Sequence, residues 1–451
     1  MAGIAGIVGT GKSESVSRML TRMAHRGRAG HKVVETKGTT LGAVWPAGAR
    51  RPILREHHVA CDSIGNGQFA EARANDGTLT LSRDPIGAVP LYYGQHADGS
   101  LCFASEVKGL LEMTRDVNEL PPGCQYDGQH LIRGDELQVR GTITEQPEDV
   151  ATTLWACLDG AVRSRIHQHT MGAWLSGGLD SSAIAALVRP HVRRLYTVAG
   201  GVAGSPDLGF ARQVADVIRS DHHEVVISLP EMLHVLPTVI YHLESFDALL
   251  VRSSIINYLV ARRMAELAPE TFSGEGGDEL FAGYDYLKTL ESCHLAQELV
   301  DLIGRLHNTA LQRVDRSAAA HGLVAHVPFV NPTIVDYATR IPVEFKIRNG
   351  IEKWILRQAM KDLLPPAVLN RPKAKFWQGA GVGDLLSNHA DQHISNEEFR
   401  HQRNLDNGWM LNSKEELMYY RIFKDAFGTL ENLSWMGRTK GAPSVTRLER
   451  T

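Results

Sequence analysis

Cysteine, net charge and long apolar runs are all scarce in this chain of 451 residues. Its five cysteines stand far apart and form no Cys-x-x-Cys pair, so their spacing predicts neither a zinc site nor a disulfide framework. The formal net charge is only −3, which gives no reason to expect nucleic acid or an anionic membrane as a partner. There is no apolar run of about 18 residues and no signal-peptide pattern, so we expect a cytoplasmic protein without membrane spans.

The composition is that of a globular protein, with 43% apolar and 22% charged residues. The length predicts two domains, and a polar, Gly- and Pro-containing stretch at 120–150 predicts their boundary. We expect an N-terminal domain over 1–140 and a second over 150–435. Period-2 apolar patches such as 101–104 predict a β-rich first domain. Strands alternating with helices predict a doubly wound parallel sheet in the second.

The segment 176–182, with sequence SGGLDSS, carries the strongest chemical signal. Apolar segments before and after it predict a buried strand, a glycine turn and a helix. A helix start offers free backbone N–H groups and a dipole that favours anions, so the turn is a candidate phosphate cradle. It supplies two glycines and three hydroxyls: Gly177, Gly178, Ser176, Ser181 and Ser182.

Asp180 is the unusual member of this loop, because a carboxylate beside phosphates repels them unless a cation lies between. Mg²⁺ is commonly held by one or two carboxylates together with phosphate oxygens. We therefore predict that Asp180 is a Mg²⁺ ligand. The alternative is an ordinary strand-to-helix turn with a serine cap.

A second phosphate-loop pattern, GxxxxGK[ST], occurs at residues 6–13. A true loop of this kind needs a buried strand before its first glycine and a helix after its last residue. Only five residues precede Gly6, and Ile4, Ile7 and Val8 look like a strand themselves. We expect no phosphate site there.

The segment 273–284, SGEGGDELFAGY, follows a predicted strand at 269–272. Together with 176–182 it resembles the synthetase domain of asparagine synthetases, which are ATP pyrophosphatases. The resemblance implies ATP and Mg²⁺ as cofactors, with Asp278 as the second Mg²⁺ carboxylate, facing Asp180. It also implies contacts with AMP from Leu175, Gly200, Ser273 and Gly274. The alternative for Asp278 is a helix N-terminal charge.

The same resemblance assigns chemistry to Glu275 and Lys373. Glu275 stands where the family's carboxylate governs formation and attack of the acyl adenylate. Lys373 matches the essential lysine of RxKxxFxxGxG, because Gly379 and Gly381 fix the register against Lys375. A fixed cation aimed at developing negative charge is typically worth ~10²–10³ in rate. A solvated surface lysine is the alternative.

The N-terminal domain is similar to the family's glutaminase at 25–27, 83–87, 90–94 and 104–108, which implies a reduced, Ntn-type class II glutamine amidotransferase-like fold. The family nucleophile is a cysteine exposed when the initiator Met is removed, whereas this chain has Ala2. The family's NGEIYN stretch is also absent, unless 65–67 is a remnant. We expect no glutamine hydrolysis by the family mechanism, and ammonia could come from an external glutaminase.

Four positions near the acid-binding region depart from the family pattern. His326 and Asn331 replace Arg and Asp, while Leu249 and Leu250 replace two threonines. A pocket for a small dianion should not lose polar partners, since unpaired buried polar groups are costly. We therefore expect ATP chemistry to be retained while the acid substrate differs.

The resulting hypothesis is an ATP-dependent amide ligase acting through an acyl adenylate on a small carboxylate and an amine or ammonia, with a homodimer left open. Asparagine synthesis from ammonia is the leading candidate, and Glu275 favours it. A ligase like the β-lactam synthetases or peptide cyclases is the second, favoured by Ala2. A non-catalytic regulatory homologue is the third, and the intact Asp180, Asp278 and Lys373 argue against it.

Overall fold

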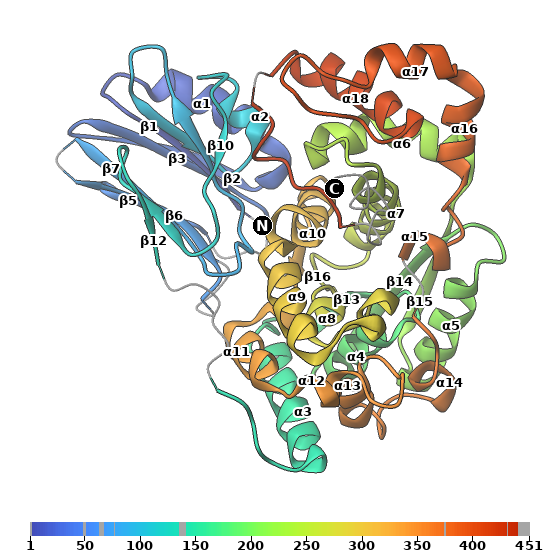
Figure 1. Ribbon diagram of the computed structural model, residues 1–451. Helices are drawn as coiled ribbons and strands as arrows, with labels where there is room; N and C mark the ends of the chain where they lie inside the picture. Colours follow the sequence, from blue (N-terminus) through green and yellow to red (C-terminus); the bar gives the residue numbers. More distant parts are fainter. Residues whose placement is uncertain are drawn as a thin grey trace.

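The computed structural model describes residues 2–47, 51–62, 67–75, 77–134, 141–373, 376–430 and 432–440. A β-rich N-terminal part lies beside a larger part that contains the remaining sheet and most of the helices (Figure 1). The suggested remnant at Gly65 and Asn66 lies outside the described residues, as do Lys375 and part of the predicted domain boundary. The boundary therefore stays a prediction.

The N-terminal part consists of two antiparallel six-stranded sheets. The first has the order β10-β8-β9-β1-β3-β2, with β10 (Asn118–Glu119), β8 (Tyr92–Gln95), β9 (Leu101–Ala104), β1 (Gly3–Val8), β3 (Thr39–Trp45) and β2 (Gly30–Thr36). The second has the order β12-β11-β7-β6-β5-β4, with β12 (Leu131–Arg133), β11 (Cys124–Tyr126), β7 (Thr78–Arg83), β6 (Phe69–Asn75), β5 (His58–Asp62) and β4 (Ile53–Arg55).

Alternation along β1 explains how these sheets pack. Ile4 joins the core between the two sheets, whereas Ala5 and Ile7 join the core that also contains residues of the helix α1 (Ser13–Arg22). Because successive side chains of a strand point to opposite faces, both faces of the first sheet are buried. Gly6 lies in mid-strand, paired with Leu41, so the pattern at 6–13 is no phosphate loop, as predicted.

The C-terminal part is built on a five-stranded parallel sheet of order β15-β14-β13-β16-β17. Its strands are β13 (Thr170–Trp174), β14 (Arg194–Gly201), β15 (Asp221–Val226), β16 (Glu270–Phe272) and β17 (Val324–His326). Met171 and Ala173 pack in one core and Trp174 in another, so helices cover both faces. The predicted doubly wound parallel sheet is confirmed.

The helices that cover this sheet or frame its edge are the following: α3 (Pro147–Arg163), α4 (Leu179–Val188), α5 (Pro206–Ile218), α6 (Leu229–Leu243), α7 (Ala248–Ala265), α8 (Gly277–Leu280), α9 (Ser292–Gly304), α10 (Ala310–Ala319), α11 (Pro332–Arg340), α13 (Trp354–Ala359) and α18 (Lys414–Phe427). The short helix α2 (Val107–Leu110) belongs to the N-terminal part. Within the described ranges, no helix has both the length and the apolar character needed to cross a bilayer.

Candidate active site

A cavity of about 470 Å³ lies at the carboxyl ends of β13 and β16. The chain winds outward in opposite directions from these two neighbouring strands, and such a switch point is where open α/β sheets bind ligands. Residues from α7, α9, α10 and the segment 352–373 also line the cavity, together with Thr439 and Lys440. Its volume is typical of a small-molecule site.

The loop after β13 is organised around one serine hydroxyl. Ser181 Oγ accepts a hydrogen bond from Ser176 N at 3.1 Å, lies 3.0 Å from Ser176 Oγ and donates to Gly178 O at 3.2 Å. These bonds fix the turn at the start of α4, where backbone N–H groups are free to meet an anion.

Most of the predicted nucleotide-binding residues line the cavity, namely Leu175, Ser176, Gly178, Asp180, Ser181, Gly200, Ser273 and Gly274. Gly177 and Ser182 do not. The backbone of Gly177 packs against Phe210 and Ala211 of α5, and Ser182 is fully buried within α4. Gly177 lies in the turn before α4, whereas Ser182 lies inside the helix, so the predicted nucleotide contact of these two residues stays a prediction.

The second glycine-rich loop approaches the first so closely that only glycine fits. A Cβ on Gly274 would lie 2.6 Å from Ser181 N, and one on Gly277 would lie 2.6 Å from Asp180 Oδ1. Cβ contacts below 3.0 Å are essentially never observed. Gly274 and Gly277 of the second motif therefore allow its loop to approach Asp180 and Ser181 of the first.

Asp180 and Asp278 meet around the ammonium of Lys353. Lys353 Nζ lies 2.5 Å from Asp180 Oδ2 and 2.5 Å from Asp278 Oδ1. Lys373 Nζ lies 2.5 Å from Asp278 Oδ2. The structure thus brings together all three charged residues that the sequence assigned to ATP chemistry around the phosphates, and adds a fourth.

Burial and charge shift the protonation of these groups in different directions. Burial raises the pKa of Asp180 above its ordinary value. Burial also disfavours the Asp278 carboxylate, but Lys353 and Lys373 outweigh it and hold the pKa of Asp278 well below its usual range. The same carboxylates outweigh burial at Lys373 and raise its pKa. The site therefore holds a charged lysine against a charged aspartate.

The donor set fits Mg²⁺, a hard cation that prefers carboxylate oxygens. Asp180 Oδ1 is buried and has no hydrogen-bond partner among the described residues, so it is free to bind a metal. The Lys353 ammonium already shows that a positive charge is accommodated between the two carboxylates. Asp180 and Asp278 could together hold the ion.

Sequence reasoning missed Lys353 and the arginines near it. Lys353 is 3% exposed at the side chain and stands just before α13, in the left-handed region at φ 53°. Arg357 pairs with Glu352 at 2.5 Å, and Arg371 pairs with Asp207. All of these line the cavity. The one available signal was a lysine beside the apolar run at 354–356, which is weak by itself.

Glu275 lies in the same cavity and is held by an arginine. Arg313 Nη2 on α10 donates to Glu275 Oε1 at 2.6 Å. The Glu275 side chain is 25% exposed and that of Arg313 11%. The carboxylate predicted to act on the adenylate is thus oriented from a helix far along the chain.

The four departures from the family pattern separate into two kinds. His326 Nε2 lies 2.6 Å from Glu270 Oε2 in a buried pair, and Asn331 caps α11 by accepting from Thr333 N. Neither side chain lines the cavity, so the structure gives these two residues no direct contact with an acid bound there, and their effect on the acid substrate stays a prediction. Leu249 and Leu250 do line it.

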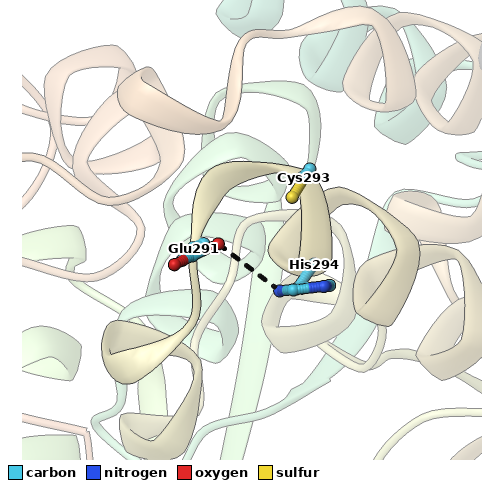
Figure 2. A group of neighbouring side chains, drawn as sticks. All are labelled: Glu291, Cys293 and His294. Atoms are coloured by element: carbon cyan, nitrogen blue, oxygen red, sulfur yellow. Dashed lines mark ion pairs between the residues drawn. The ribbon is translucent and has the colours of Figure 1, made fainter.

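A group of metal-ligating side chains lies outside the cavity, at the start of α9. Figure 2 shows Glu291, Cys293 and His294, whose ligand atoms lie within 4.8 Å of one another. All three are exposed, and the Glu291 Oε2 to His294 Nδ1 distance is 3.9 Å. Exposed groups of this kind are common without a metal, so we assign no site there.

Comparison with known proteins gives the family. Residues 154–314 and 291–436 match the model described as asparagine synthase, and residues 50–112 match a glutamine amidotransferase domain. The chain is 32% identical to asparagine synthetase B (glutamine-hydrolyzing) of Escherichia coli K12 over 395 residues, or 81% of this chain and 70% of that protein. It is 33% identical to a probable asparagine synthetase of Schizosaccharomyces pombe over 419 residues, or 83% and 75%. This chain belongs to the asparagine synthase family.

The relatives are longer than this chain. Asparagine synthetase 2 of Lotus japonicus, 33% identical over 390 residues, is matched over 66% of its length and over 80% of this chain. Among solved structures, NMN synthetase from Francisella tularensis is 14% identical to this chain, with a TM-score of 0.30. The alignment covers 64% of this chain and 98% of that one. A TM-score this low indicates little structural similarity.

Proposed function

We propose that this chain is an ATP-dependent ligase that forms an amide through an acyl adenylate, releasing pyrophosphate and then AMP. The observation that carries the proposal is the meeting of Asp180, Asp278, Lys353 and Lys373 in one cavity at the switch point of the sheet. A regulatory homologue with a vestigial site has no need of this arrangement, and the desolvation of buried charges is costly even when they are paired.

The reaction divides into two displacements. A carboxylate oxygen of the acid attacks the α-phosphorus of ATP, and the bond from that phosphorus to the bridging oxygen breaks, releasing pyrophosphate. A nitrogen nucleophile then attacks the acyl carbon, loses a proton and displaces AMP. Both displacements require positioning and stabilisation of negative charge.

The residues of the cavity supply these requirements. Backbone N–H groups at the start of α4 bind phosphate oxygens, and Lys373 directs its charge at the oxygens that become negative. Glu275, oriented by Arg313, acts on the adenylate step. Mg²⁺ held by Asp180 and Asp278 would neutralise charge on the phosphates.

Aspartate with ammonia is the leading substrate pair, because the family and Glu275 both favour it. Leu249 and Leu250 favour a second candidate, a ligase for a different acid. They present apolar surface to the cavity from α7, and apolar surface does not compensate the desolvation of a second carboxylate.

We also propose that the chain does not hydrolyse glutamine, which its relatives are named for. Three cysteines of the N-terminal part are buried, and burial raises the pKa of the Cys102 thiol to about 12. Cys61 Sγ donates to Ala2 O at 3.2 Å. The thiolate is the reactive form of cysteine, so Cys102 is a poor nucleophile, and burial of Cys61 and Cys124 limits access to their sulfur atoms.

The test is pyrophosphate and AMP release by the purified chain with Mg²⁺-ATP across a panel of carboxylates, with ammonium or glutamine as nitrogen source. We expect one acid to elicit stoichiometric pyrophosphate and amide with ammonium, and no glutamate from glutamine. Aspartate as the decisive best acid would exclude the second candidate. Glutamate production would refute the glutamine proposal, and release of no pyrophosphate with any acid would refute the ligase itself.

A further inference from the structure

A cluster of buried charges joins the two parts of the chain. We call it the interface cluster; it consists of Arg26, Glu106 and Lys108 from the N-terminal part and Glu244, Asp315 and Arg316 from the C-terminal part. Each of the six is at most 3% exposed. Three cations thus face three anions, and the whole set is withdrawn from water.

Arg26 is the residue that ties the two parts together. Its guanidinium pairs with Glu106 in its own part and with Asp315 across the interface, where Nη1 donates to Asp315 Oδ1 at 3.2 Å. Arg316 completes the cluster, donating from Nη2 to Glu244 Oε2 at 2.9 Å and from Nη1 to Asp315 Oδ2 at 2.8 Å. Removing one partner from such a set leaves an uncompensated buried charge.

The C-terminal members Asp315 and Arg316 lie on α10, and the same helix carries Arg313 into the cavity. Arg313 and Arg316 are three positions apart, which is less than one helical turn. The helix is further fixed by Gln312 Nε2, which donates to Leu243 O at 2.7 Å. In Figure 1, α10 lies between the β-rich part and the sheet that bears the cavity. A displacement of α10 at the interface therefore displaces Arg313.

We infer that Arg26 is a positioning residue for amide formation: it holds α10 through Asp315 and so places Arg313 and, with it, Glu275. The inference rests on the proposed function of the cavity. It gives the N-terminal domain a role that needs no glutamine chemistry, because that domain then serves as the anchor for a helix of the ligase site.

The first test compares Arg26→Met with Asp84→Asn. Asp84 is equally buried, but its hydrogen bonds all remain within the N-terminal part, from the backbone N–H groups of Phe69, Ile86, Ala88 and Val89. We expect kcat for pyrophosphate release with Mg²⁺-ATP, the best acid and ammonium to fall about 10- to 100-fold in Arg26→Met, since small misplacements have such effects. The KM for ATP should change little, and Asp84→Asn should keep the wild-type kcat.

A double-substitution cycle separates positioning from general damage. If Arg26 acts through Arg313, then Arg26→Met combined with Arg313→Met should lower kcat no further than Arg313→Met alone, and Arg26→Lys should restore part of the rate. Multiplied effects in the double variant, or an equal loss of kcat in Asp84→Asn, would overturn the inference.

Hydrogen exchange tests the inference without any turnover, so its failure is distinguishable from failure of the ligase proposal. Backbone amides of α10 should exchange faster in Arg26→Met and in Asp315→Asn than in the wild type or in Asp84→Asn. Unchanged protection of α10 in Arg26→Met would overturn the positioning role even if the chain proves to be an active ligase.

Discussion

Lys353→Met removes the ammonium that lies between Asp180 and Asp278 while keeping a side chain of similar length. In the metal-free variant the buried carboxylates of Asp180 and Asp278 lose their shared cation, and only Lys373 still pairs with Asp278. We expect this variant to be markedly destabilised, and we expect Mg²⁺ to restore part of the loss, because the ion can take the position of the missing charge.

The magnitude follows from the geometry. Both Nζ to O distances are 2.5 Å and the lysine side chain is 3% exposed. At an effective dielectric constant of about 20, two opposite unit charges roughly 4 Å apart attract by about 4 kcal/mol. The cost of desolvating the Lys353 ammonium offsets much of the attraction to its two carboxylates. Removing one partner of a buried pair typically costs about 3–5 kcal/mol, which corresponds to a decrease in Tm of about 3–5 °C for a chain of this size.

The assay is calorimetric unfolding with and without Mg²⁺, and the chain offers a matched control. Lys346 is also 3% exposed, but it has no ion-pair partner within the described ranges, and burial lowers its pKa to about 7. Lys346→Met should therefore stabilise the protein at neutral pH, opposite in sign to Lys353→Met. If Lys353→Met unfolds like the wild type in both conditions, the two carboxylates do not share a buried cation and the reasoning fails.

Three further predictions follow from the same contacts. Gly277→Ala should abolish ATP-dependent pyrophosphate release while the far-ultraviolet circular dichroism stays unchanged, because its Cβ would lie 2.6 Å from Asp180 Oδ1; retained activity would show that the loops need not meet so closely. Burial and Asp278 raise the pKa of Glu279 from 4.5 to about 7, so the free energy of unfolding of the wild type should fall as pH rises over this range. Glu279→Gln should remove that fall, and its stabilisation in urea unfolding should grow from pH 4.5 to 7 to at most about 3 kcal/mol. Glu291→Gln, at an exposed position, is the control and should show no such pH dependence. The pKa of Lys346 runs the other way, from 10.5 down to about 7, so the wild type should gain stability as pH rises from 7 to 10.5 and Lys346→Met should lack that slope.

Local patterns were enough to predict several parts of the protein. The alternation of apolar segments with a glycine turn predicted β13, the loop and α4 in order, because strand, turn and helix depend on neighbouring residues. The mid-strand position of Gly6 was predicted from Ile4, Ile7 and Val8 in the same way. The types of residue in the two glycine-rich loops also indicated phosphate and metal chemistry before any contact was known.

Contacts between distant residues were decided only by the tertiary structure. Lys353 reaches Asp180 from 173 positions along the chain, and no local pattern encodes where a lysine side chain ends after the sheet and helices have packed. The same holds for Gly177, which packs against α5, for Ser182, which is buried within α4, and for His326, which forms a buried pair with Glu270 on the neighbouring strand. Sequence determines which chemistry the loops can perform, whereas packing determines which side chains share the cavity, because burial and charge pairing act on all elements at once.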